Sequence, residues 1–310
     1  SKDARSSMAT AITDAYIKAL PSKKKAFQKR LKAWQADEKS LETWASEFTK
    51  SHSNLTYAAT EPVVYYLMAD LGFKDQTPKG YTQSTASGGE PAPADLQSFQ
   101  KLIEDKGVDV LVNNAGHGYR AAIEESAPEA VEELFQTNFF GPMELTRLVL
   151  PQMRARRSGL IVNVTSIGAV RGALGNGYYS AAKGALELAS EALAKEVTHL
   201  GIRVMLAEPG ALRTGFYGAR LGSSALTIPD YDALAEQYRK SAQTDRHDQP
   251  GDPDRAGTIL VETALRPDAP FRLLLGSDAV QTAVETLENR LLEARSWAEV
   301  SDQSDFFIQS

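Results

Sequence analysis

The sequence predicts an α/β protein built on a Rossmann-like, doubly wound parallel sheet, with a helical extension before it. From position 54 onward, short β-rich runs alternate with helical segments of ten or more residues, which is typical of βαβ units. Before that position the apolar residues recur at helical spacing instead. We therefore expect a helical segment at 1–52 and one Rossmann-like domain at 53–310.

The composition limits the functions that are possible. The chain has 310 residues, of which 42% are hydrophobic and 24% are charged, so it can bury a large core. Its formal net charge of −6 argues against nucleic acid or an anionic membrane as a partner, because both select basic surfaces. The absence of cysteine excludes disulfides and Cys-ligated zinc. Without a bilayer-length apolar run or a basic-then-apolar N-terminal signal, the protein is expected to be cytoplasmic.

The N-terminal helix is predicted by one apolar stripe. Its members are spaced three, four or seven residues apart, as one helix face requires: Phe27, Leu31, Trp34, Leu41, Ala45 and Phe48. Basic residues crowd 23–32, and we interpret them as a solvated helix face rather than a polyanion site.

The segment 54–106 is expected to alternate strand and helix. The expected elements are a strand at 54–60, a helix at 61–71, a strand at 81–85 and a helix at 95–106. Gly72 and Gly107 end the two helices, and the Gly- and Pro-rich stretch 87–94 predicts a loop.

The alternation is most regular from position 108 to the end. The expected strands lie at 108–112, 160–164, 202–207 and 271–275. The expected helices lie at 128–137, 141–156, 178–200, 254–265 and 278–298. A polar, Pro-containing stretch at 213–253 interrupts the pattern.

Several short motifs lie at the ends of these strands or on the helices between them. They are the turn Asn113-Asn114-Ala115-Gly116, Asn138, Ser166, the pair Tyr179 and Lys183, and Pro209-Gly210 with Thr214. Each is weak alone, and a Tyr and a Lys at helical spacing are usually surface neighbours. In this order and at these spacings, however, they resemble the short-chain dehydrogenase/reductase family. The resemblance extends from Val108 to near the C-terminus.

The Tyr–Lys pair is physically suited to proton transfer. Tyr179 and Lys183 are four residues apart on one predicted helix, so they share a face. A phenol has an ordinary pKa of about 10, and a neighbouring ammonium lowers that pKa. Tyr179 is therefore expected to donate or accept a proton near neutral pH. Ser166 can hold a carbonyl or hydroxyl oxygen by a hydrogen bond and stabilise the charge that develops there.

The resemblance implies an NAD(P)(H)-dependent oxidoreductase that interconverts an alcohol and a carbonyl. It makes Tyr179 the acid/base, Lys183 its tuner, Ser166 the oxygen holder and Asn138 the anchor of a water that relays the proton. The residues it places near the cofactor are Asn114, Ala115, Gly116, Tyr179, Lys183, Pro209, Gly210 and Thr214.

The resemblance also bears on the partners. The stretch 213–253 would cover a small-molecule substrate, and its apolar members favour an apolar one: Phe216, Tyr217, Leu221, Leu226 and Ile228. The helices at 144–156 and 178–200 would pair across the axis of a homodimer, and the second is rich in small residues that suit close packing.

One part of the family pattern is missing. Members normally open with a strand, a Thr-Gly-x-x-x-Gly-x-Gly turn and a helix, whose backbone amides hold the cofactor's phosphates. The nearest equivalent here is 59–63, which has no glycine and carries Glu61, whose charge would repel a phosphate. The stretch Gly116–Ala121 fits a dinucleotide fingerprint in form, but we interpret it as the continuation of the Asn-Asn-Ala-Gly turn. Cofactor binding, and therefore catalysis, depends on this missing turn.

Residues 5–114 resemble a different family, the metal-binding lipoproteins of ABC zinc and manganese importers. The resemblance rests on the long helix, a strand followed by Thr60-Glu-Pro-Val-Val-Tyr-Tyr-Leu67, and Gly89-Glu-Pro-Ala-Pro-Ala-Asp-Leu96. In that family the turn after the strand supplies a His ligand, where this chain has Glu61. One carboxylate does not make a metal site, so no metal ligands are expected.

The chain therefore reads as a chimera joined near 107–114. An enzyme is the favoured reading. One alternative is a catalytically silent chimera that lacks the dinucleotide phosphate site, and another is a solute- or metal-binding module.

Overall fold

The computed structural model describes residues 2–51, 56–57, 74–77, 79, 98, 101–102, 108–217, 221–243 and 248–305. Two compact units make up the chain, Ser1–Lys106 and Gly107–Ser310. The expected helix at 61–71 and strand at 81–85 lie outside the described residues, as do Glu61 and most of 54–60 and 95–106. The division into 1–52 and 53–310 therefore stays a prediction.

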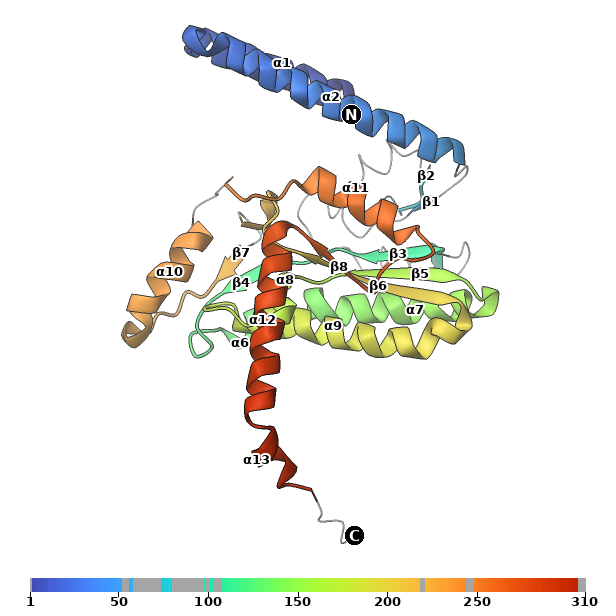
Figure 1. Cartoon of the computed structure of the whole chain (residues 1–310), viewed down its shortest axis with the longest axis vertical. Helices are drawn as coiled ribbons and strands as arrows, with labels where there is room; N and C mark the ends of the chain where they lie inside the picture. Colours follow the sequence, from blue (N-terminus) through green and yellow to red (C-terminus); the bar gives the residue numbers. More distant parts are fainter. Residues whose placement is uncertain are drawn as a thin grey trace. The chain divides into compact units, whose positions relative to one another are not determined.

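The first unit begins with a helical hairpin. Helices α1 (Lys2–Ala19) and α2 (Lys24–Ser51) lie side by side (Figure 1), joined by the single turn η1 (Pro21–Lys23). The sequence analysis expected one helical stretch here. Pro21 breaks it, because its ring disfavours helical geometry at Leu20, which has φ −136° and ψ 72°. The rings of Tyr16 and Phe27 stack across the turn at 5.5 Å. Of the strands in this unit, the described residues form β1 (Thr56–Tyr57), which pairs in parallel with β2 (Lys74–Asp75).

The second unit is built on a four-stranded parallel sheet in the order β3-β5-β6-β8. Its strands are β3 (Val110–Asn113), β5 (Gly159–Val164), β6 (Ile202–Pro209) and β8 (Arg272–Leu275). Each lies within three residues of its expected position. The predicted α/β class, the parallel sheet and the N-terminal helices are confirmed.

Helices cover both faces of this sheet (Figure 1). Helices α7 (Gly141–Arg156) and α9 (Gly177–Val197) lie on one face, and α11 (Pro253–Ala264) lies on the other. Strand β5 shows why, because its side chains alternate. Leu160 and Val162 join the apolar cluster that includes Ala256 of α11. Asn163 points to the opposite face and donates a hydrogen bond to Ser190 of α9.

The remaining elements connect or flank these layers. They are β4 (Gly118–Arg120), α6 (Pro128–Phe135), the π-helical turn η3 (Gln136–Phe140), α8 (Ile167–Val170), η4 (Thr198–Leu200), η5 (Gly215–Tyr217), β7 (Leu221–Ser223), η6 (Pro229–Tyr231), α10 (Asp232–Gln243), α12 (Ser277–Ser296) and α13 (Ala298–Asp302). The sequence analysis missed β4 and β7, which pair in parallel. A search of the described helices found none with the length and hydropathy needed to cross a bilayer.

A chain of buried polar side chains links the sheet to its helices. Asn113 at the end of β3 donates to Oδ1 of Asn163 at 2.7 Å. Asn163 donates in turn to the hydroxyl of Ser190 at 2.7 Å, and Ser190 donates to the carbonyl of Leu186 at 2.6 Å. Since the three side chains are 0–5% exposed, each bond replaces hydration that the folded protein has lost.

We predict that Asn163→Ala lowers the free energy of unfolding by about 1–3 kcal/mol, because it removes the nearest acceptor of the buried Asn113 amide and the donor to the buried Ser190 hydroxyl. Urea denaturation followed by circular dichroism measures the change. The matched control is Asn289→Ala on the exposed face of α12, which should leave the midpoint unchanged. If both variants unfold at the same urea concentration, the buried polar side chains do not have the structural role proposed for them.

Candidate active site

The site lies where three neighbouring strands end. The turn 114–116 follows β3, Ser166 follows β5, and Pro209 ends β6. The strands are parallel and adjacent, so their carboxyl ends lie at one edge of the sheet, the usual place for a binding site in this architecture. The structure thus brings these predicted site segments to one edge.

Lys183 is buried at this edge of the sheet, where a single hydrogen bond offsets the loss of hydration of its ammonium. Its side chain is 4% exposed, and Nζ donates one hydrogen bond of 2.9 Å to the carbonyl of Val164 at the end of β5. Burial lowers its pKa from 10.5 to about 8. Gly116 approaches closely, since a Cβ added there would lie 3.2 Å from Nζ. The turn after β3 can therefore pack against Lys183 only with a side chain as small as that of glycine.

Asn138 is fully buried and holds the same turn from the side. It sits in the middle of η3, where Nδ2 donates to the carbonyl of His117 at 2.9 Å and Oδ1 accepts the N–H of His117 at 3.2 Å. Its amide still has a second N–H and a second lone pair. Its proposed role as the anchor of a relay water stays a prediction.

Tyr179 and Ser166 are brought together as predicted. Tyr179 is 7% exposed, and Ser166 lies close enough to its hydroxyl to lower its pKa; the Ser166 Oγ accepts the N–H of Gly168 at 2.9 Å. Gly168 allows this approach, because an added Cβ would lie 3.1 Å from the Tyr179 ring. The described geometry therefore fixes the phenol and the serine hydroxyl around one point.

The electrostatics of Tyr179 differ from the expectation. The sequence analysis expected Lys183 to bring the pKa of Tyr179 toward neutrality. Instead, burial raises that pKa to about 12, opposed by the hydrogen bond from Ser166 and by the charge of Arg120. The sequence pattern gives spacing on a helix but not the degree of burial, and here burial dominates.

Arg120 is a site residue that the sequence analysis missed. It ends β4, close enough to Tyr179 and Tyr217 to interact with both electrostatically. Burial lowers its pKa, and its Nε is buried without a hydrogen-bond partner among the described residues. No local sequence signal marks the strand at 118–120, and residues 116–121 were expected to continue the Asn-Asn-Ala-Gly turn.

The remaining predicted cofactor residues form the rim of this edge. The Gly210 N–H donates to the Leu275 carbonyl at 2.9 Å, and the next N–H, of Ala211, donates to Asp278 at 2.7 Å. Thr214 is exposed, and its Oγ1 accepts the N–H of Phe216 at 3.2 Å. Asn114 is also exposed, whereas Ala115 is half-buried.

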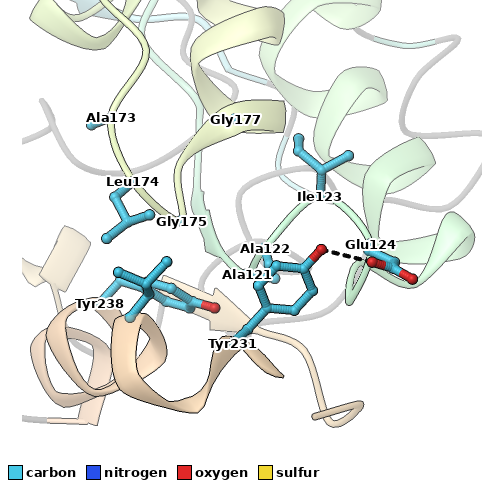
Figure 2. Close-up of a pocket in the computed structure, with 11 residues that line it drawn as sticks. Ala121, Ala122, Ile123, Glu124, Ala173, Leu174, Gly175, Gly177, Tyr231 and Tyr238 are labelled. Carbon is cyan, nitrogen blue, oxygen red and sulfur yellow. Dashed lines mark hydrogen bonds between the residues drawn. The ribbon is translucent and has the colours of Figure 1, made fainter. Parts of the chain in front are cut away.

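A pocket of about 670 Å³ is formed by the segments around the site (Figure 2). The residues that line it are Ala121, Ala122, Ile123, Glu124, Ala173, Leu174, Gly175, Gly177, Tyr231, Leu234 and Tyr238. One segment directly follows β4, another leads into the helix of Tyr179, and the last two residues come from α10. Most of the lining is apolar.

Two tyrosine hydroxyls hold α10 and η6 at this pocket. The Tyr231 hydroxyl donates to Glu124 at 2.7 Å (Figure 2), and the Tyr238 hydroxyl donates to Glu125 at 3.0 Å. Glu125 is fully buried and also accepts the N–H of Ile228 at 2.8 Å. The polar stretch expected at 213–253 is thus an ordered cover in its described part.

The described part of the site fits the nicotinamide end of NAD(P)(H). Lys183 uses one of its three N–H donors on the protein, so two remain for hydroxyl groups of a ligand. Ala115 and Gly116 present backbone rather than bulky side chains at the same edge. The residues that would meet the phosphates, 59–63, lie outside the described residues. No group of three His, Asp or Glu side chains suited to a metal ion occurs within the part of the chain that the structure describes.

Comparisons with known proteins match two family models. A model described as short chain dehydrogenase matches residues 94–221, and one described as zinc-uptake complex component A, periplasmic, matches residues 2–143. The 3-ketodihydrosphingosine reductase of Bacteroides thetaiotaomicron is 38% identical over 182 residues, which are 58% of this chain and 67% of that protein.

Solved structures agree. A short-chain dehydrogenase from Streptomyces avermitilis is 32% identical with a TM-score of 0.67, and the match covers 84% of this chain and 93% of that one. A short-chain dehydrogenase/reductase from Burkholderia phymatum, solved in complex with NAD, has a TM-score of 0.61 over 77% of this chain and 95% of its own. At 19% identity, this second match supports the fold alone.

We predict that Lys183→Met stabilises the protein at pH 7. The lowering of the Lys183 pKa from 10.5 to about 8 corresponds to a destabilisation of roughly 3 kcal/mol, at about 1.4 kcal/mol per pKa unit. Below pH 8 the group is charged in both the folded and unfolded states, so this cost is fully present. Between pH 8 and 10.5 only the unfolded state holds the proton, so the cost declines as pH rises.

The measurement is the free energy of unfolding of Lys183→Met and the unsubstituted protein from pH 7 to 10.5. The advantage of the variant should be largest at pH 7 and shrink above pH 8. Lys195→Met, on an exposed face of the same helix, is the matched control and should show no such trend. A variant less stable than the parent at pH 7 would contradict the prediction.

Proposed function

This chain belongs to the short-chain dehydrogenase family of oxidoreductases, and from that premise we propose that it interconverts an alcohol and a carbonyl compound with NAD(P)(H). The observation that carries the proposal is the burial of Tyr179 and Lys183 on one helix, with the Ser166 side chain close enough to the Tyr179 hydroxyl to lower its pKa. A phenol and a hydroxyl aimed at one point are what a carbonyl oxygen needs when it gains charge and a proton.

In carbonyl reduction, Tyr179 is the general acid. Because burial raises its pKa to about 12, the phenol holds its proton throughout the neutral range and can donate it to the substrate oxygen. Ser166 donates a second hydrogen bond to that oxygen and stabilises the charge that develops on it. Lys183 lies on the next turn of the same helix, where its ammonium has two N–H donors left for a ligand. NAD(P)(H) supplies the hydride when it is bound.

The pocket supports a small, mainly apolar substrate. Its walls include Ile123, Leu174 and Leu234, and its one carboxylate, Glu124, is hydrogen-bonded to Tyr231. Burial of apolar substrate surface against such walls contributes roughly 25 cal/mol per Å². We propose that the substrate's apolar body lies in this pocket with its carbonyl toward Tyr179.

The main alternative is a catalytically silent chain. It is favoured by the sequence at 59–63, where glycine is absent and Glu61 introduces a negative charge. A solute- or metal-binding function is a weaker alternative, which metal analysis of the protein after chelation and reloading with zinc or manganese tests.

Titration with NADH and NADPH, followed by calorimetry, separates an enzyme from a silent chain. We expect saturable binding of at least one dinucleotide at millimolar concentration or below. Tyr179→Phe should then retain that affinity but lose at least 100-fold in kcat, because it removes the donated proton. Tyr178→Phe, at the neighbouring position of α9, is the matched control and should keep its rate. The absence of binding by both dinucleotides would overturn the enzyme reading.

We also propose that the protein is a homodimer that pairs through α7 and α9. Leu188 on α9 is 69% exposed, and the exposed face around it carries the small residues Ala181 and Ala192. A second copy of the chain would bury this face and remove the leucine from water.

Leu188→Asp should shift the protein from dimer to monomer, because it places a charge in the pairing face. Light scattering after size-exclusion chromatography measures the mass. Leu287→Asp on α12 changes a leucine that is 57% exposed and should leave the dimer intact. A parent protein with the mass of one chain would exclude the homodimer.

A further inference from the structure

Arg120 is close enough to the proposed acid for its charge to lower the pKa of Tyr179, and its backbone is held in a strand. It is the last residue of β4 and pairs with Ser223 of β7 in the parallel ladder. The next N–H, of Ala121, donates to the carbonyl of Gly175 at 3.0 Å, which ties β4 to the segment before α9. The residues directly after Arg120 form one wall of the pocket (Figure 2). The backbone that carries the guanidinium is therefore held by a strand rather than by a loose loop.

The positive charge of Arg120 has no counterion in the described part of the chain. Its Nε is buried without a hydrogen-bond partner, and none of the described carboxylates forms an ion pair with it. The groups that do sense its charge, Tyr179 and Tyr217, are neutral phenols at pH 7. The carboxylates that follow in sequence, Glu124 and Glu125, accept hydrogen bonds from tyrosines instead.

An arginine in this position needs an anion. A guanidinium stays protonated at every relevant pH, so it cannot escape the cost of burial by losing its proton. Buried charges in proteins are normally paired, and arginine matches the two oxygens of a carboxylate or phosphate in a fork geometry. A group that arrives with the substrate would supply the missing charge.

We propose that Arg120 binds an anionic group of the substrate, a carboxylate or a phosphate monoester, while the substrate's carbonyl lies at Tyr179. The substrate is then an apolar carbonyl compound with one acidic oxygen group close to its reacting end. The reaction itself rests on the proposed function, but the anion site does not, because binding can be measured without turnover.

Three aldehydes that differ at one position test this site. They are 4-formylbenzoate, 4-formylphenyl phosphate and the neutral 4-methylbenzaldehyde. Their dissociation constants are measured by calorimetry with the Tyr179→Phe variant, with and without NADH, so that loss of catalysis does not affect the result. We expect at least one anionic aldehyde to bind ten-fold or more tightly than the neutral one. Which anion is preferred distinguishes a carboxylate from a phosphate ligand.

Arg120→Met should remove this preference while leaving the affinity for 4-methylbenzaldehyde unchanged, because it keeps an unbranched apolar stem but not the charged guanidinium. Arg120→Lys should keep part of the preference, since it retains the charge without the fork. Arg147→Met, which replaces a guanidinium that is 76% exposed on α7, is the matched control and should bind like the parent. A melting curve for each variant verifies folding.

Two results would overturn the proposal: no preference for an anion in the parent, or a preference that survives in Arg120→Met. Turnover of the three aldehydes by the chain with Tyr179 intact separates this failure from that of the proposed function. If all three aldehydes are reduced equally, with the same KM in Arg120→Met, the protein is an oxidoreductase but Arg120 is not an anion site. If the protein prefers the anionic aldehydes but reduces none of the three, the anion site stands and the proposed oxidoreductase function fails.

Discussion

The hydrogen bond from the Lys183 ammonium to the Val164 carbonyl joins the helix of the proposed acid to the end of the central strand β5. It places a positive charge in a region that water has left, which is why the pKa of Lys183 falls to about 8. The neighbouring parts of the site are arranged around this charge. The turn after β3 can approach it because Gly116 has no side chain, and Asn138 clamps the backbone just beyond that turn. The arrangement costs stability, as is common where a site is built for chemistry rather than for folding.

Much of this could be predicted from the sequence because it depends on local patterns. Strands such as 160–164 and helices such as 141–156 follow from the spacing of apolar residues, and the positions of Ser166 and Tyr179 follow from those elements. The features that could not be predicted depend on how deeply a side chain is buried and on which distant segments pair as strands. Strand β4 has three residues and forms only against β7, about a hundred positions later, so no local signal marks it. Arg120 was overlooked with it. The pKa of Tyr179 was misjudged because burial outweighs its neighbours.

The two family models match different, overlapping parts of the chain. The short chain dehydrogenase model begins at residue 94 and covers every predicted site residue, whereas the zinc-uptake model covers 2–143. They overlap at 94–143, which in its described part contains strands β3 and β4 and helix α6. A splice inside such a unit keeps the strand order and the handedness of the crossover. It does not carry over the phosphate-binding turn, which in this fold class precedes the unit. The stretch 59–63, which has no glycine, lies before the overlap, and the acid–base groups lie after it or within it.

The π-helical turn at Gln136–Phe140 makes the site more sensitive than the fold to the deletion of a single residue. There the Gly141 N–H reaches back five residues to Gln136, and Asn138 occupies the middle of the widened turn. Loss of one residue from 136–140 would let α6 and α7 join as one regular helix. Because the widened turn takes up one extra residue, the flanking helices would keep nearly the same faces, but Asn138 would lose its place in the turn. The apolar faces of α6 and α7 could adjust by repacking, but the clamp on His117 could not, because it needs one amide in one orientation. A deletion in this turn can therefore abolish catalysis in such a protein while leaving its thermal stability intact. A screen for folding alone would retain the inactive variant.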